Sequence, residues 1–109
     1  MRAGRLRFRL ELQAPEDIRD DIGGVRQDWQ THATVWGDIV PMSGRELWQA
    51  QQIESRLSHR LTLRYTPALL PSWRIRLKDT ARVFQPVSVR TLEERDRTTE
   101  VLAFEVVEA

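Results

Sequence analysis

The chain has 109 residues, of which 40% are hydrophobic and 30% charged, so we expect residues 1–109 to form one soluble globular domain. It contains no cysteine, which excludes disulfides and thiolate metal sites and fits assembly in a reducing cytoplasm. We expect no membrane span and no secretion signal, because no long apolar run exists and the basic opening residues precede no apolar segment.

The net charge is only +1, but the charges are unevenly spread along the chain. Residues 1–12 and 56–90 are basic, whereas residues 13–55 and 91–109 are acidic. A nearly neutral chain with opposite charges in different segments suits contact with copies of itself. The charged outer faces of ordinary strands would explain the same distribution equally well.

The first predicted element is a half-buried strand over residues 6–12, where apolar and charged side chains alternate without a break. Its core-facing side chains would be Leu6, Phe8, Leu10 and Leu12.

Residues 13–24 predict a mobile acidic loop within a long hairpin connection. Pro15 and several carboxylates disfavour a continued strand, and Gly23-Gly24 allows the chain to double back. The adjacent carboxylates of Asp20 and Asp21 lack further ligands at the spacing that a hard cation requires, so we interpret them as part of a solvated loop.

A second strand is predicted with residues 25–30 as its approach and residues 33–40 as its main body. The apolar residues near Trp36 do not alternate cleanly, so a bulge is expected at Gly37. Pro41 would end this strand.

Residues 41–55 predict a short helical insert. Ser43 and Glu46 have the spacing of a capping box, and Leu47, Ala50 and Ile53 would share one face. Because so short a helix is marginal by itself in water, it must lean on the body of the protein or on another subunit. Trp48 lies beside the apolar stripe and suits either a core or an interface.

Residues 57–65 predict the third strand, with Leu57, His59, Leu61, Leu63 and Tyr65 on one side. A loop over residues 66–71 follows, in which Leu69 and Leu70 would cover an end of a barrel or touch a neighbour.

Three further strands are predicted over residues 73–78, 82–90 and 100–107, with a turn at Asp79-Thr80. Pro86 cannot donate a ladder hydrogen bond, so its strand should be bulged or at an edge. The side chains expected in the core are Trp73, Ile75, Leu77, Val83, Val87, Val89, Leu102, Phe104 and Val106.

These elements predict a mainly β fold. We expect a small antiparallel β-barrel or sandwich of about six strands, because short strands at regular spacing are typical of those architectures. One short helix is inserted between strands two and three.

No motif in the chain indicates an enzyme, a cofactor site or a metal site. The two histidines, His32 and His59, lack a second ligand at metal spacing, and His59 is expected to be a half-buried strand residue. There is no phosphate-binding glycine loop and no nucleophile beside a base.

Binding of single-stranded nucleic acid is the alternative function, since small barrels with basic grooves and aromatic residues bind single strands by stacking. The predicted third and fourth strands, taken as neighbours, would present one basic face, although the tryptophans are expected at inward positions. That face consists of Arg60, Arg64, Arg74, Arg76 and Lys78.

Several segments in order resemble one known family, the phage head–tail joining proteins, which are small head-completion proteins also called stoppers or adaptors. The matching segments are RAGRLRFRLEL (2–12), IGGVRQDWQTHATVWGDI (22–39), PMSGRE (41–46), AQQ (50–52), HRLTLRY (59–65) and TLEERDR (91–97). They extend over nearly the whole chain.

The resemblance implies a structural protein in the neck of a tailed phage virion. The resemblance further implies a ring of about six or twelve copies, which is compatible with the physics because identical subunits in a ring need two different complementary patches. The ring would contact a portal or adaptor protein on the head side and a tail completion or tail tube protein on the tail side, with possible non-specific contact to packaged DNA. A tail-side completion protein of similar size is a further alternative.

The resemblance also implies two sets of assembly residues. Within the insert, which would close the channel or buttress neighbouring subunits, the candidates are Ser43, Arg45, Glu46, Trp48, Gln51 and Gln52. Within the 13–24 segment, which would dock on a neighbouring ring, the candidates are Asp17, Arg19, Asp20, Asp21 and Ile22.

Overall fold

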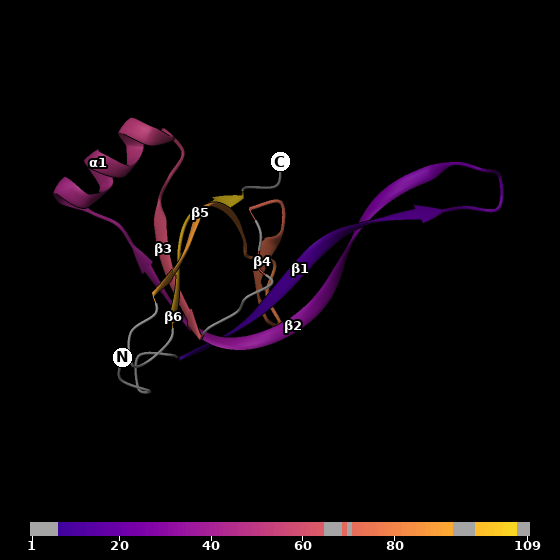
Figure 1. Cartoon of the computed structure of the whole chain (residues 1–109), viewed down its shortest axis with the longest axis horizontal. Coiled ribbons are helices and arrows are strands. Elements are labelled where there is room, and N and C mark those ends of the chain that lie inside the picture. The colour runs from indigo at the N-terminus through magenta and orange to yellow at the C-terminus, as the bar shows by residue number, and fades with distance from the viewer. Residues whose placement is uncertain (1–6, 65–68, 70, 93–97, 107–109) are drawn as a thin grey trace.

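The computed structural model describes residues 7–64, 69, 71–92 and 98–106, and this part of the chain contains six strands and one helix (Figure 1). Their bounds are β1 (Phe8–Arg19), β2 (Val25–Pro41), α1 (Gly44–Ile53), β3 (His59–Arg64), β4 (Arg74–Leu77), β5 (Val83–Leu92) and β6 (Thr98–Val106).

The strands form a closed antiparallel barrel in the order β1-β2-β3-β6-β5-β4. The predicted mainly β fold, with one helix between the second and third strands, is therefore confirmed. Closure pairs both sides of every strand within the barrel, so the barrel wall itself has no open edge.

The barrel interior is filled by one apolar cluster, to which every strand contributes. Its buried side chains are Leu10, Leu12, Leu61, Leu63, Leu69, Ile75, Phe84, Val101 and Ala103. The predicted core positions confirmed here are Phe8, Leu10, Leu12, Leu61, Leu63, Trp73, Ile75, Leu77 and Val89. Phe84 was not predicted, and Leu57 and Val87, which were expected in this core, pack in the second cluster instead. Leu69 packs in this core, while Leu6, Tyr65 and Leu70 lie outside the described residues.

A second cluster lies between α1 and the outside of the barrel. Met42, Ala50 and Leu57 are buried there, and Leu102 of β6 packs against them. This cluster explains why the predicted core-facing residues of the last strand, Leu102, Phe104 and Val106, were wrong. Thr99, Val101 and Ala103 face the interior instead, because β6 carries apolar side chains on both faces and periodicity alone does not distinguish them.

The predicted mobile loop at residues 13–24 is wrong over most of its length. β1 continues through Pro15 to Arg19 and pairs with β2 from Val25 to Thr31. Only residues 20–24 form a turn, in which the Asp20 Oδ1 atom accepts hydrogen bonds from the backbone N–H groups of Ile22 (3.0 Å) and Gly24 (2.7 Å). Gly23 supplies the positive φ of 83°.

The bulge in β2 lies at His32 and not at Gly37 as expected, because Leu12 pairs with Ala33 whereas Gln13 pairs with Thr31. The predicted bulge at Pro86 is confirmed by a register shift between Pro86 and Ser88. The predicted turn after β4 is also present, with Asp79 at a φ of 64°.

Gly37 is instead required by close packing against the two neighbouring strands, β1 and β3. A Cβ atom there would lie 2.6 Å from Leu10 Cδ1, 2.7 Å from Leu63 Cδ2 and 2.9 Å from the backbone oxygen of Thr62. The backbone oxygen belongs to a paired strand and cannot move without disturbing the sheet.

We expect Gly37→Ala to lower the free energy of unfolding by about 1–3 kcal/mol, the usual cost of overpacking a filled core. Urea unfolding of the purified protein would measure the change. Gln49→Ala on the exposed side of α1 is the control and should change stability by less than about 0.5 kcal/mol. Equal midpoints for the two variants would contradict the packing argument.

Candidate assembly surfaces

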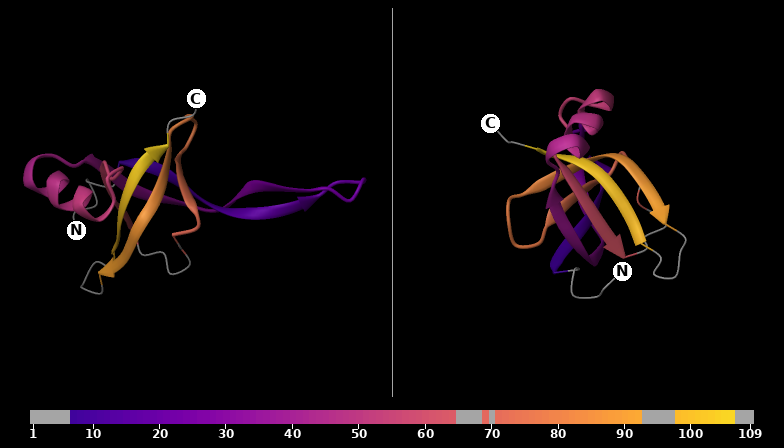
Figure 2. Two further views of the ribbon diagram at one scale, coloured as in Figure 1. Left: turned by 90° about the horizontal axis from the view of Figure 1, so that it is seen from above. Right: turned by 90° about the vertical axis from the view of Figure 1, so that its left-hand side faces the viewer.

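The outer part of the β1–β2 hairpin, residues 13–31, projects from the barrel and is called the arm here. Figure 2 shows the arm and α1 at opposite ends of the molecule, whose principal extents are 50 × 30 × 24 Å. Of the strands that the structure describes, none pairs with Ala14–Arg19 or Val25–Gln30 except these two segments with each other. A two-stranded ribbon is at best marginally stable alone in water, so the arm is suited to a contact with another chain.

The tip of the arm combines exposed apolar side chains with carboxylates. Ile22 is 93% exposed and Val25 is 61% exposed. Asp17 and Asp21 are also exposed, whereas the Asp20 carboxylate is engaged by the turn. All five predicted docking residues (Asp17, Arg19, Asp20, Asp21 and Ile22) therefore lie on the distal half of the arm, although on an ordered strand end and turn.

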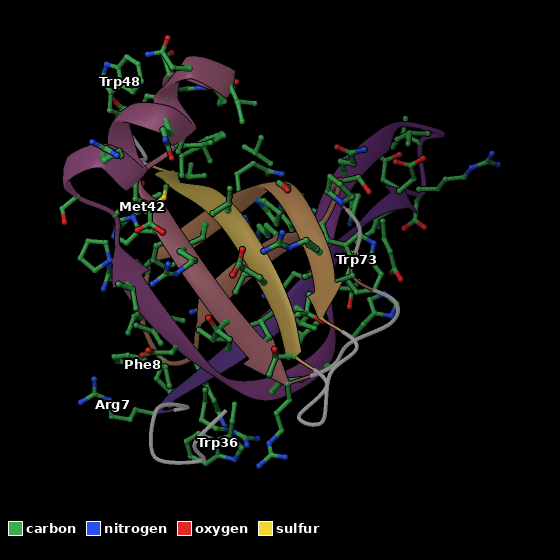
Figure 3. The ribbon with its side chains drawn as sticks, turned by 60° about the vertical axis from the view of Figure 1, so that its left-hand side comes forward. Arg7, Phe8, Trp36, Met42, Trp48 and Trp73 are labelled. Carbon is green, nitrogen blue, oxygen red and sulfur yellow. The ribbon has the colours of Figure 1, made fainter. Side chains whose placement is uncertain are left out.

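The base of the arm is fixed against β4. The Arg74 guanidinium lies 4.6 Å from the ring centroid of Trp29, and its Nε donates a hydrogen bond of 2.6 Å to Gln13 Oε1. The ring of His32 lies 5.1 Å from that of Trp73, which stands beside the arm in Figure 3. Stacking of guanidinium and aromatic rings is favourable, so these contacts hold the direction of the arm.

The helix α1 buries one side and exposes an aromatic residue on the other. Leu47 and Ala50 pack on Met42 and Leu57, whereas Trp48 is 64% exposed and points away from the barrel (Figure 3). Ile53 was predicted on the buried face, and this is wrong because it is 79% exposed at the last helical position.

The predicted capping box is also absent. Ser43 is the N-cap residue but its side chain makes no capping hydrogen bond. Glu46 instead accepts a hydrogen bond of 2.6 Å from Arg60 Nη1, which ties the first turn of α1 to β3. Gln51 donates to the Leu57 carbonyl oxygen at 3.3 Å. The remaining insert candidates, Arg45 and Gln52, are exposed.

The predicted single basic face does not exist, because β3 and β4 are not neighbours in the barrel. Arg60 lies on β3 and pairs with Glu46, whereas Arg74 and Arg76 lie on β4 beside β1. Arg76 pairs with Glu11 at 3.3 Å and also donates to the Thr80 carbonyl oxygen. The two groups of arginines therefore point to different sides.

The strand order instead joins two members of the predicted face, Arg64 and Lys78, to Arg9 and Trp36, which sequence reasoning did not connect with them. Arg9 pairs with Trp36 across β1 and β2, and Lys78 donates its backbone N–H to the Arg9 carbonyl oxygen at 3.0 Å. Continuing the β2–β3 register by one residue places Arg64 beside Trp36. Lys78, Arg9, Trp36 and Arg64 thus cross the outer face of four strands, and we call them the basic row.

The basic row has a partly covered aromatic side chain at its centre. Trp36 is 45% exposed, contrary to the expectation that tryptophans face inward, and the Arg9 guanidinium lies 4.7 Å from its ring centroid. Arg7 is exposed at the same end of the barrel (Figure 3). Three carboxylates lie close to the row along the chain: Asp79 follows Lys78, Asp38 is two residues beyond Trp36, and Glu11, which pairs with Arg76, is two residues beyond Arg9.

Within the part of the chain that the structure describes, no group of three or more histidine or acidic side chains could hold a metal ion. His59 is half-buried, as predicted, with its ring 5.2 Å from that of Phe84. Ser58 Oγ accepts a hydrogen bond from the Glu105 N–H and lies 2.8 Å from His59 Nδ1. Burial lowers the pKa of His59.

The described helix is too short and too polar to cross a membrane.

Comparisons with known proteins agree with this architecture. A family model described as "Phage head completion protein" matches residues 1–107. Protein SF1141 from Shigella flexneri 2a, known from a solution structure, is 25% identical, with a TM-score of 0.77 and complete coverage of both chains. A chain in the virion of a native gene transfer agent particle has the same fold, with 24% identity, a TM-score of 0.59 and coverage of 95% of this chain and 98% of that one. No curated protein matches the sequence.

The pKa of His59 predicts a pH dependence of stability. Because burial lowers this pKa below its ordinary value of 6.5, the unfolded chain binds more protons near that pH than the folded chain does. The free energy of unfolding should therefore fall as the pH drops from 7.5 through 6.5 and level off below the folded pKa. Urea unfolding at pH 7.5, 6.5 and 5.5 would measure it.

We expect His59→Gln to flatten this part of the profile, while His32→Gln controls for the loss of an imidazole elsewhere. Equal slopes for the wild-type protein and His59→Gln would show that His59 does not carry the effect.

Proposed function

The chain belongs to the phage head completion protein family, and from this membership we propose that it forms a ring at the portal–tail junction of a tailed phage. There it completes the DNA-filled head and provides the surface to which the tail attaches. The role is that of a passive building block of the virion, without catalysis. The likeness to a chain of a gene transfer agent virion supports the same setting.

The observation that carries the proposal is the pair of exposed surfaces at opposite ends of one rigid barrel (Figure 2). A ring subunit that also binds the layers above and below it needs several exposed patches, of which two different ones meet in the contact between copies. The arm tip and the Trp48 side of α1 are the most prominent protruding surfaces with exposed apolar side chains. Each buries apolar area only when another chain covers it.

We assign the partners by position. Copies of the chain contact one another within a ring of about six or twelve subunits, a closed cyclic arrangement. A portal or adaptor protein lies on the head side and a tail completion or tail tube protein on the tail side. Basic side chains that face the channel would contact packaged DNA through its phosphates without sequence preference.

Two arginines of the predicted basic face already pair with carboxylates, Arg60 with Glu46 and Arg76 with Glu11, and this argues against single-stranded nucleic acid as the main ligand. A tail-side completion role is distinguished by co-purification with isolated tails instead of filled heads.

Deletion of the gene from its phage tests the proposal directly. We expect filled heads and free tails that do not join, and restoration of tailed particles when the gene is supplied in trans. Electron microscopy and a plaque assay would record both. Infectious tailed particles from the deletion, or no density for the protein at the neck of a reconstructed virion, would refute the proposal.

A single substitution on α1 tests the contact more finely. We expect Trp48→Ser to leave the free energy of unfolding within about 0.5 kcal/mol, because the side chain is mostly exposed. The yield of tailed particles should fall about tenfold or more, as for an aromatic anchor lost from an interface. Gln49→Ser, at the adjacent exposed position, is the matched control, and equal yields for the two variants would remove Trp48 from the interface.

A further inference from the structure

We propose that the subunit contact within the ring is made by the acidic arm tip of one copy and the basic row of the next copy. This inference rests on the proposed ring, and it names the two patches and the side chains that meet. The arm supplies carboxylates and the apolar side chains of Ile22 and Val25. The basic row supplies Lys78, Arg9 and Arg64 around Trp36, with Arg7 beside them.

The charges of the two surfaces are complementary. The arm between residues 16 and 28 carries five carboxylates against two arginines. Within it, Glu16 and Asp28 lie directly opposite each other in the hairpin register. Like charges at such positions are destabilising, so an approaching cation stabilises the arm as well as the contact. Opposite patches of this kind fix the register of two docking surfaces.

The apolar parts of the two surfaces also match. Ile22 and Val25 are the apolar side chains at the tip, and each is more than half exposed. Trp36 presents the exposed aromatic surface at the centre of the basic row. An aromatic anchor surrounded by charged side chains is the usual composition of an interface centre and its rim.

A single chain cannot make this contact with itself. Arg9 and Arg19 are ten residues apart on the same continuous strand, β1. At the usual rise per residue of a strand they are separated by about 33 Å. The arm extends from the end of the hairpin opposite to the row, and its base is held by Arg74, Trp29 and Gln13. The row must therefore receive the arm of another copy.

Stacking of Trp36 favours a protein partner over nucleic acid. One face of the indole ring is already covered by the Arg9 guanidinium at 4.7 Å. A nucleic-acid base needs an open aromatic face on which to stack. Branched aliphatic side chains such as Ile22 and Val25 can instead pack along the ring edge and the Arg9 stem.

Cysteine cross-linking tests the contact, because the native chain has no cysteine and any disulfide must come from the introduced residues. In one experiment the purified Ile22→Cys and Trp36→Cys chains would be mixed at high concentration and mildly oxidised. In a second experiment the two chains would be co-expressed in assembling phage and then mildly oxidised. We expect a disulfide-linked dimer only when both variants are present. A mixture of the Ile22→Cys and Ser88→Cys chains is the control and should give none, because Ser88 is exposed on β5, outside the arm, the basic row and α1.

A charge swap supplies the second measurement, since Trp36→Cys itself removes part of the contact. We expect Asp17→Arg with Asp21→Arg to weaken self-association about tenfold or more, and Arg7→Glu with Lys78→Glu to do the same, because each places like charges together. The chain that carries all four changes should associate again. Arg90→Glu, away from both surfaces, should leave association unchanged. Sedimentation would measure association of the purified chains, and particle assembly would report on the phage.

The outcomes separate this inference from the proposed function. A ring at the neck with no Ile22–Trp36 cross-link and no rescue by the fourfold charge swap would overturn the contact and leave the ring intact. Salt-sensitive retention of DNA by the wild-type protein that is lost in Arg7→Glu with Lys78→Glu, with self-association unchanged, would assign the row to nucleic acid. Absence of the protein from the neck would overturn both.

Discussion

The structure depends on one constraint, which is that β1 and β2 are longer than the barrel they close. Within the barrel each strand has neighbours on both sides, but the six pairs from Ala14–Gln30 to Arg19–Val25 have only each other among the described strands. A ribbon of two strands satisfies half of its backbone groups and buries little apolar surface. The same hairpin that completes the fold thus carries an element suited to contact with another chain.

Much of the barrel could be predicted from local sequence, because a strand with one buried face alternates strictly. Leu10 and Leu12, or Leu61 and Leu63, are recognisable for this reason. The arm could not be predicted in the same way. Its two faces are both exposed, so Pro15 and the carboxylates suggested a loop although the residues pair regularly. The buried face of β6 was mispredicted for the opposite reason, because both faces of this strand are covered. Val101 faces the barrel interior and Leu102 packs under α1.

The candidate assembly residues divide along similar lines. Ile22 and Trp48 were recognisable because each belongs to one contiguous segment, and their exposure agrees with that interpretation. The basic row was not recognisable, because Arg9, Trp36, Arg64 and Lys78 are brought together only by the strand order. That order is a long-range property, and no local pattern in the chain specifies it. Because no local pattern specifies the strand order, β3 and β4 were also wrongly expected to be neighbours.

The packing under α1 bears on whether the insert is a movable gate or a fixed buttress. Met42, Ala50 and Leu57 are buried between the helix and the barrel, and Leu102 packs against them. Fully exposing large apolar side chains costs about 1.5–3 kcal/mol each, so swinging α1 away would consume much of the stability of a small domain. The Glu46–Arg60 pair holds the first helical turn to β3 in the same position. These contacts favour a helix that stays on its own barrel and presents Trp48 to a neighbour, which makes α1 a fixed part of the subunit surface.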